Sequence, residues 1–313
     1  MGKKKAANPA DRMAGGAAGA QFNTKGDKIF DIFNIALMAV IALIIFYPLY
    51  FVVVASFTDP TVVNRGDILL YPVKFFASGY KKTFSYSPLW RGYLNSFIYT
   101  GLGTVVALAA TLAGGYALSR KDMGFRQPIM LLFTFTMFFS GGMIPSYLLM
   151  RNLGIYDTLW VMILPGAVSV YNLIVCRTFF ENTLPKELLE ASQIDGCTDF
   201  GFFFRIALPL SGTIAAVLAL FYASAKWNSY FDALIYLMDE RKMPLQIVLR
   251  NLLLIGQSQN MVTGDAKSLA ERKAMADQLK FCVIVVSAAP LLAIYPFLQK
   301  YFAKGVMIGA VKG

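Results

Sequence analysis

Four acidic side chains lie close together in a chain that is otherwise strongly apolar, and they are the residues best suited to chemistry. They are Glu187, Glu190, Asp195 and Asp199, which fall within thirteen positions around Gly196. Carboxylates accept strong, charge-assisted hydrogen bonds from lysine and arginine. The cluster therefore predicts a docking surface for a protein with a basic groove. The alternative is an amphipathic helix resting on lipid, but such helices normally carry lysine and arginine, because inner leaflets are anionic.

Other reactive groups are scarce in the sequence. It has no histidine, and its three cysteines (Cys176, Cys197 and Cys282) form no CxxC pair. These counts argue against zinc sites, haem ligation, histidine-dependent catalysis and a disulfide framework. The sequence also lacks the GxxxxGK[ST] phosphate loop. We therefore expect no catalytic residue, no metal and no cofactor in this chain.

The acidic cluster needs a short helix and a turn to position it. Pro185 suits a first helical turn, where its missing N–H costs nothing, and two of the acids follow near the positive end of that helix. Gly196 fits the left-handed position that ends a helix. A second short helix is expected over residues 200–209, with Pro209 at the entry to the next apolar run.

Composition identifies the chain as an integral membrane protein. Of its 313 residues 57% are hydrophobic and 15% are charged, with a mean hydropathy of +0.56. A soluble domain carries about 25% charged residues. Long apolar runs, each near the ~20 residues that cross a bilayer, predict six transmembrane helices in an all-α, polytopic fold. They occupy roughly 29–57, 92–118, 128–150, 158–180, 206–237 and 279–302.

Basic residues beside the apolar runs predict the orientation in the membrane. The basic tail, residues 1–28, and the loop after the second run favour a cytoplasmic N-terminus and C-terminus. The net charge of +11 is attributed to such flanks, and no polar basic domain suggests nucleic-acid binding. This orientation puts residues 181–205 in the cytoplasm and residues 58–91 and 238–278 outside.

The long outer segment, residues 238–278, is mixed in character. Its middle has helical periodicity over Leu245, Val248, Leu249, Leu252 and Leu253. Long connections of this kind are often functional, although a solvated cap is the equal alternative.

The sequence EASQIDGCTDFGFFFRIALPL, which begins at Glu190, resembles the EAA loop of permease subunits in binding-protein-dependent ABC importers. The matching positions are Glu190, Ala191, Gly196, Ile206, Leu208 and Pro209, while Ser192 replaces the usual second alanine. The chain end, YPFLQKYFAKGVMIGAVKG, is similar to that of sugar permeases related to the second maltose permease subunit. Residues 141–180 resemble the subgroup that imports complex oligosaccharides and aldouronates.

The resemblance implies a type I ABC importer permease fold over residues 29–313. It implies three kinds of partner: a second permease subunit in a heterodimer, a dimer of ATP-binding subunits that binds ATP, and an extracellular or periplasmic sugar-binding protein. Residues 181–205 would be the coupling loop that transmits ATPase movement. Its expected contact residues are Glu187, Glu190, Ala191, Asp195, Gly196, Ile206, Leu208 and Pro209.

A path for a sugar requires aromatic rings beside polar groups. The candidates are Tyr171, Asn172, Tyr222, Lys226, Trp227, Asn228 and Tyr230. Lys226 comes 21 residues after Arg205, about 31 Å along a straight helix, which places it near the outer boundary or a wet cavity. A lysine and a tryptophan at that depth also fit an interfacial anchor.

Two other classes of function remain as alternatives to a sugar-importer permease. A secondary, ion-coupled solute carrier would usually show paired internal repeats and charges at mid-membrane, and the sequence has no evident repeat and few such charges. A membrane scaffold would have no role in transport.

Overall fold

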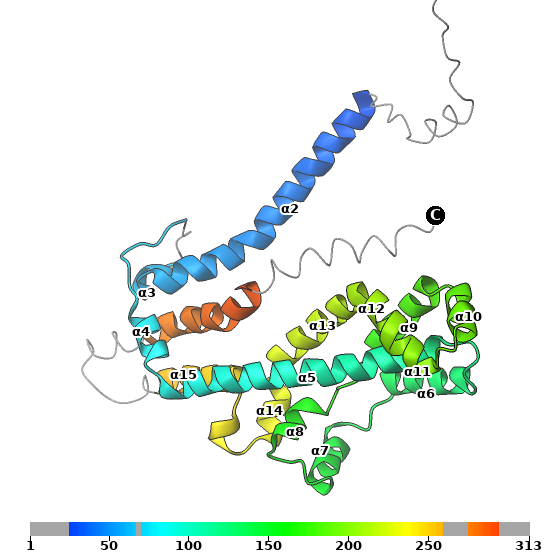
Figure 1. Cartoon of the computed structure of the whole chain (residues 1–313). Helices are drawn as coiled ribbons and strands as arrows, with labels where there is room; N and C mark the ends of the chain where they lie inside the picture. The colour runs from blue at the N-terminus through cyan, green and yellow to red at the C-terminus, as the bar shows by residue number, and fades with distance from the viewer. Residues whose placement is uncertain (1–24, 67–69, 259–274, 294–313) are drawn as a thin grey trace, which may run out of the picture. The chain divides into compact units, whose positions relative to one another are not determined.

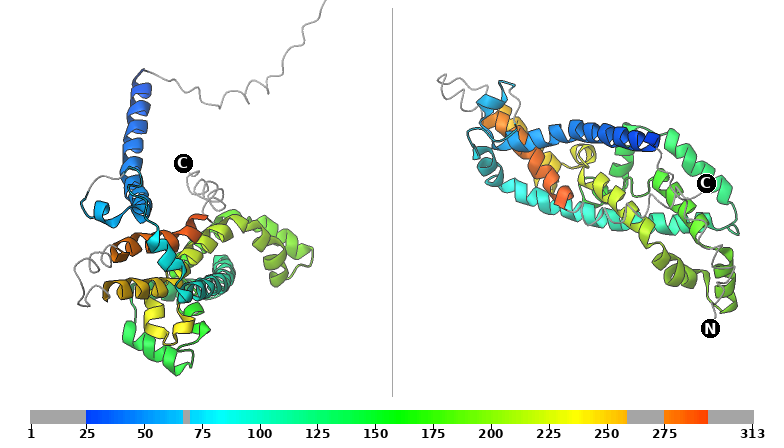
Figure 2. Two further views of the ribbon diagram at one scale, coloured as in Figure 1. Left: turned by 90° about the vertical axis from the view of Figure 1, so that its left-hand side faces the viewer. Right: turned by 90° about the horizontal axis from the view of Figure 1, so that it is seen from above.

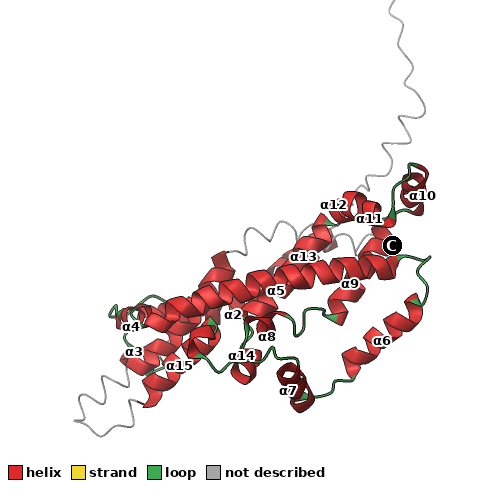
Figure 3. Cartoon of the chain, turned by 60° about the horizontal axis from the view of Figure 1, so that its bottom comes forward, coloured by secondary structure: helices red, strands yellow, loops and turns green. Residues whose placement is uncertain are grey.

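The computed structural model of the protein describes residues 25–66, 70–258 and 275–293 (Figure 1). The described residues form helices joined by loops, without any strand (Figure 3). The prediction of an all-α fold is confirmed. The chain divides into two compact units, Met1–Val52 and Val53–Gly313.

Helix α2 (Lys25–Phe57) is the described part of the first unit and runs on into the second. Its apolar side chains are exposed along most of its length, with Ile35 at 69% and Leu43 at 67%. A helix that is apolar on every side is typical of a membrane span, because lipid takes the place of a protein core.

The second unit is organised around the long helix α5 (Ser87–Ser119), which packs against α13 (Gly212–Trp227) and α9 (Val170–Thr183) (Figure 1). A buried apolar cluster joins the three helices through Leu112, Tyr116, Cys176, Phe180, Leu218 and Tyr222. Helix α15 (Leu245–Ser258) contacts the beginning of α5.

Shorter helices complete the second unit. They are α3 (Pro60–Val63), α4 (Ser78–Phe84), α6 (Arg126–Phe138), α7 (Met143–Asn152), α8 (Leu159–Ile163), α10 (Lys186–Ile194), α11 (Asp199–Phe202), the π-helix η1 (Phe203–Ala207), α12 (Leu208–Leu210), α14 (Phe231–Tyr236) and the 3-10 helix η2 (Glu240–Lys242). A final helix includes Met275–Ala293. Helices α9 to α12 gather at the end of α5 near Ser119 (Figures 1 and 2).

Three helices of the described part are long and apolar enough to span a membrane: Gly26–Phe57, Ser87–Ser119 and Met275–Ala293. The number rises to five if two sharply bent pairs of helices each count as one span. The six continuous helices expected from the apolar runs are therefore not all present as such. The chain does form the several apolar helices of a polytopic membrane protein.

The predicted spans 128–150, 158–180 and 206–237 are each interrupted, which corrects the assumption that one apolar run makes one helix. The first bends by 116° between α6 and α7, where Gly142 has a φ of 87°. The second is divided between α8 and α9 by a stretch that contains Pro165 and Gly166, whose φ is 66°. Proline cannot donate a backbone hydrogen bond, and glycine tolerates positive φ. These residues allow breaks that a count of apolar residues does not reveal.

The predicted helix in the outer segment is confirmed as α15, with Leu245, Val248, Leu249 and Leu252 buried. Leu245, Leu249 and Leu252 share a buried cluster with Leu89 of α5 and Leu279 of the last helix. The rest of that segment, residues 259–274, lies outside the described residues, as do the tail before residue 25 and residues 294–302 of the last predicted span.

Candidate functional site

The first half of the predicted coupling loop is helix α10, which begins after Pro185 and ends in a glycine turn. Asp195 caps the helix, and Gly196 follows with a φ of 77°. The N–H of Gly196 donates to the carbonyl of Gln193 at 3.0 Å, and the N–H of Cys197 donates to that of Ser192 at 2.9 Å. This pair of bonds defines the Schellman motif that ends many helices at glycine. The predicted role of Gly196 as a helix stop is confirmed.

The second half turns directly into a transmembrane helix. Thr198 caps α11 by accepting from the N–H of Gly201 at 3.2 Å. The π-helix η1 and α12 follow, and the chain then bends by 78° at Ser211 to enter α13. Pro209 lies in α12, just before this bend, as expected for a residue at the entry to a span. Any rigid displacement of α11 and α12 therefore reaches α13 through a single residue, Ser211.

The coupling loop separates its acidic and apolar residues. Glu187, Glu190 and Asp195 are exposed. The side chains of Leu188 and Leu189 pack against the buried cluster described above. The remaining predicted contact residues divide similarly, with Ala191, Gly196 and Pro209 exposed and Ile206 and Leu208 half-buried. The helix thus presents carboxylates outward while its inner face holds it to the membrane helices.

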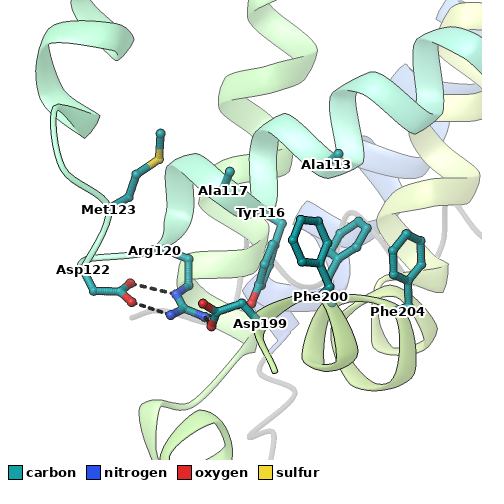
Figure 4. Close-up of a pocket in the computed structure, with 10 residues that line it drawn as sticks. Ala113, Tyr116, Ala117, Arg120, Asp122, Met123, Asp199, Phe200 and Phe204 are labelled. Carbon is teal, nitrogen blue, oxygen red and sulfur yellow. Dashed lines mark hydrogen bonds and ion pairs between the residues drawn. The ribbon is translucent and has the colours of Figure 1, made fainter. Parts of the chain in front are cut away.

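Arg120, the residue after α5, joins this helix end to the coupling loop (Figure 4). Its Nη1 donates to Asp199 Oδ1 at 3.0 Å and to the hydroxyl of Tyr116 at 3.1 Å. Its Nε donates to Asp122 Oδ1 at 2.7 Å, and Nη2 pairs with the second oxygen of the same carboxylate. The guanidinium is only 14% exposed. One arginine therefore satisfies three partners on two separate segments.

The electrostatics of this group follow from the bidentate pair. Hydrogen bonding from Arg120 lowers the pKa of Asp122, and the same bonds raise the pKa of Arg120. Both groups stay charged near neutral pH. Since the Asp122 and Asp199 carboxylates are 63% and 67% exposed, water screens both ion pairs and reduces their contribution to stability.

Apolar rings also stand at the surface beside this group. A hollow of about 560 Å³ lies between the end of α5 and the start of the α11–η1 helix (Figure 4). Phe200 and Phe204 line it and are 79% and 60% exposed. Ile194, at the end of α10, is 86% exposed. Exposed apolar side chains gathered in this way are compatible with the protein-docking surface predicted from the sequence.

Sequence reasoning did not identify Arg120 as part of this site. Arg120 belongs to the basic loop after the second apolar run, and Asp199 is one of the four clustered acids. Their positions are 79 apart, so no local spacing predicts that they meet. The one available signal was the location of Arg120 at the end of an apolar run.

The predicted sugar-path residues differ in their exposure. Tyr171 and Asn228 are exposed, whereas Asn172, Tyr222 and Trp227 are buried. Tyr230 is half-buried, and its ring faces the guanidinium of Arg250 at 5.9 Å.

Two of the buried residues have their polar groups bonded within the protein. The Tyr222 hydroxyl is 2.7 Å from Thr111 Oγ1 and accepts from the N–H of Ser169 at 3.1 Å. The indole N–H of Trp227 donates to the carbonyl of Ser287 at 3.2 Å. Both side chains thus hold helices together in this structure.

Lys226 has partners that the sequence did not predict. The estimate of its depth assumed a straight helix from Arg205, and the 78° bend at Ser211 makes that assumption wrong. Its Nζ donates to the carbonyls of Met162, Ile163 and Pro165 at 2.9, 3.2 and 3.0 Å. All three N–H groups therefore have acceptors within the chain.

The described residues include no group of three or more histidine, cysteine, aspartate or glutamate side chains suited to a metal ion. Cys176 and Cys282 are buried and free, and Cys197 is a half-buried free thiol.

Comparisons with known proteins agree with this architecture. Residues 122–308 match the family described as binding-protein-dependent transport system inner membrane component. The chain is 40% identical over 288 residues to the polygalacturonan/rhamnogalacturonan transport system permease protein YtcP of Bacillus subtilis (strain 168), which covers 92% of this chain and 99% of YtcP. It is 39% identical over 291 residues to protein LplC of the same organism, which covers 93% of this chain and 97% of LplC.

A solved structure is also similar. It is the crystal structure of a bacterial ABC transporter involved in the import of the acidic polysaccharide alginate. The match has a TM-score of 0.77 and 31% sequence identity, and it covers 90% of this chain and 99% of that chain.

Proposed function

Because the chain belongs to the family of binding-protein-dependent transport system inner membrane components, we propose that it is the membrane-spanning permease subunit of an ATP-driven sugar or oligosaccharide importer. The observation that carries the proposal is the coupling loop, in which exposed acids and a positive-φ glycine are joined directly to α13. A secondary carrier has no use for such a loop. The names of the relatives, which include permeases for polygalacturonan and rhamnogalacturonan, make acidic oligosaccharides the first substrates to test.

The proposed transporter complex contains three further kinds of component. A second permease subunit pairs with this chain in the bilayer, a dimer of ATP-binding subunits supplies hydrolysis, and a sugar-binding protein delivers substrate outside the cell. ATP is bound by the partner ATPase, because this sequence contains no phosphate loop. The chain itself translocates substrate without performing a chemical reaction.

Coupling follows from the geometry of the loop. The exposed carboxylates of Glu187, Glu190 and Asp195 meet basic residues in a groove of the ATPase, where charge-assisted hydrogen bonds are strong. The turn at Gly196 fixes the angle between α10 and α11. Arg120 transfers part of the force to α5, and the chain after Pro209 transfers the rest to α13.

This assignment requires the coupling loop to face the cytoplasm. Both termini then lie inside, and residues 58–91 and 238–278 lie outside, where the second of these segments contacts the binding protein. Asp157 and Lys242 brace that outer side, because Lys242 Nζ donates to the Asp157 carboxylate at 2.8 Å.

Within the translocation path, Tyr171 and Asn228 are the best candidates for substrate contact, because both side chains are exposed. Tyr222 and Trp227 are weaker candidates, since their polar groups are already bonded between helices. Asn172 and Tyr230 are candidates of intermediate strength for substrate contact.

Reconstitution of the whole complex tests the function. The chain, its permease partner and the ATPase are placed in vesicles with the binding protein and a labelled oligogalacturonide or a neutral oligosaccharide. Uptake should require both ATP and the binding protein. Uptake by the purified chain alone, driven by an ion gradient, would identify a secondary carrier, and an assembled complex without substrate-stimulated ATPase activity would identify a scaffold.

A further inference from the structure

The break between α8 and α9 leaves backbone carbonyls that the helices themselves cannot satisfy. In a helix each carbonyl accepts from the N–H four residues later, and the last four lack such donors. Here the chain beyond α8 meets Pro165, which has no N–H, and Gly166 at a φ of 66°. The N–H of Ala167 turns back to Leu164 at 3.0 Å rather than to Ile163. The carbonyls at this helix end therefore need donors from elsewhere, and inside a bilayer an unsatisfied carbonyl is costly.

Lys226 of α13 supplies those donors. Its three bonds go to Met162, Ile163 and Pro165, all within 3.2 Å of Nζ. A lysine ammonium carries three N–H donors and no acceptor. The ammonium thus has one carbonyl acceptor for each of its N–H groups.

A glycine of α5 leaves room for the aliphatic stem of Lys226. The stem crosses α5 at Gly103, where an added Cβ would lie 3.2 Å from both Cδ and Cε of Lys226. That distance is shorter than an ordinary van der Waals contact, so even alanine would crowd the stem. Gly101, one half-turn away on the same helix, has no neighbouring atom within 4 Å of such a Cβ.

We infer that Lys226 is a positioning residue that caps the interrupted α8–α9 segment and fastens it to α13. Substrate contact and interfacial anchoring are not its roles. One consequence rests on the proposed function: α13 continues from the predicted coupling loop, so movement of that loop reaches the end of α8 and the break after it through this lysine.

Hydrogen exchange tests the cap without any measurement of transport. In detergent, amides of residues 160–169 should exchange about tenfold or more faster in Lys226→Met than in the wild type, since a charge-assisted hydrogen bond is lost while most of the stem remains. Lys226→Arg, which keeps the charge and the donors, should recover part of the protection. Exchange at the wild-type rate in Lys226→Met would overturn the inference.

Chemical rescue separates the ammonium from the packing of its stem. In Lys226→Ala, added propylammonium replaces the missing atoms from Cγ to Nζ and should restore slow exchange in residues 160–169. Propanol has a similar stem without the charge and should not. Equal rescue by the two compounds, or by neither, would contradict a cap made by the ammonium.

A milder pair of variants covers the case in which Lys226→Ala does not fold. Gly103→Ala crowds the lysine stem and should also speed exchange in residues 160–169, whereas Gly101→Ala should leave it unchanged. Identical exchange in these two variants would also count against the inference. None of these experiments measures uptake. A result that contradicts the Lys226 cap can therefore be distinguished from one that contradicts the importer assignment.

Discussion

Arg120 and Asp199 are joined by a bond of 3.0 Å between Nη1 and Oδ1, although 79 positions separate them in the sequence. The bond links the end of α5 to the first residue of α11. Besides the packing of Leu188 and Leu189, the predicted coupling loop is thus tied to α5 by this contact and to α13 by the chain that enters it. A displacement of the loop should move both helices.

The Arg120 contact predicts how firmly the loop is held. In Arg120→Gln, amides of residues 195–207 should exchange up to about tenfold faster, because the loop loses its tie to α5. Exposure of Asp199 at 67% limits the effect, since water screens the pair. Hydrogen exchange with mass spectrometry measures the change.

Lys121→Gln is the matched control for this prediction. It removes an exposed positive charge at the next position and should leave exchange in residues 195–207 unchanged. Equal acceleration in the two variants would mean that net charge, rather than the Arg120 bond, holds the loop.

Features set by neighbouring residues could be predicted from the sequence, whereas contacts between distant residues could not. The turn at Gly196 was predictable because helix termination depends on a few adjacent positions. The helix α15 was predictable because its apolar side chains repeat with helical period. The partners of Arg120 and Lys226 depend on how helices pack, and a single sequence does not contain that information in any local pattern.

Interrupted spans were the main error, and its cause is physical. Residues 158–180 are apolar throughout the break at Pro165 and Gly166, so hydropathy alone predicts one helix. The break is possible because the cation of Lys226, more than 60 residues later in the chain, satisfies the carbonyls it exposes. A bilayer tolerates irregular backbone only where the protein supplies such partners.

The outer brace predicts a pH-dependent stability. Burial raises the pKa of Asp157, but hydrogen bonds from Lys242 and from the N–H groups of Met238 and Asp239 outweigh it and hold the pKa below its usual range. Because the pKa of Asp157 is lower in the folded state, its stabilising effect is complete at pH values above the pKa in the unfolded chain, about 3.9. The effect is lost as the pH falls through the pKa in the folded protein. Asp157→Asn should therefore destabilise the protein by about 1.5–3 kcal/mol at pH 7, and the difference should shrink in acid.

Thermal unfolding in detergent at several pH values measures this effect. Asparagine is tolerated at the φ of 53° that Asp157 adopts, so the substitution removes the charge without adding backbone strain. Glu240→Gln, an exposed carboxylate in the same region, is the control and should have little effect at any pH. A loss of stability in Asp157→Asn that is the same at pH 3 and pH 7 would rule out the charged carboxylate as the brace.

The orientation of the chain is open to direct labelling. In a background without the native cysteines, Lys121→Cys should react with an impermeant maleimide only from the cytoplasmic side. Met238→Cys should react only from outside. The native Met238 is 71% exposed, so a cysteine there is accessible to the reagent. The opposite pattern would place the coupling loop away from ATP and remove the basis of the proposed mechanism.

The most direct measurement is substrate imported per ATP hydrolysed in reconstituted vesicles, for Glu190→Ala and Gly196→Val. Valine at a φ of 77° should cost about 1–2 kcal/mol in that conformation and misdirect the turn. Loss of the Glu190 carboxylate should weaken retention of the ATPase about tenfold. The account predicts normal membrane insertion and permease pairing in both variants, with less ATPase retained or fewer substrate molecules imported per ATP. Wild-type retention and wild-type uptake per ATP in both would show that this loop does not couple hydrolysis to transport.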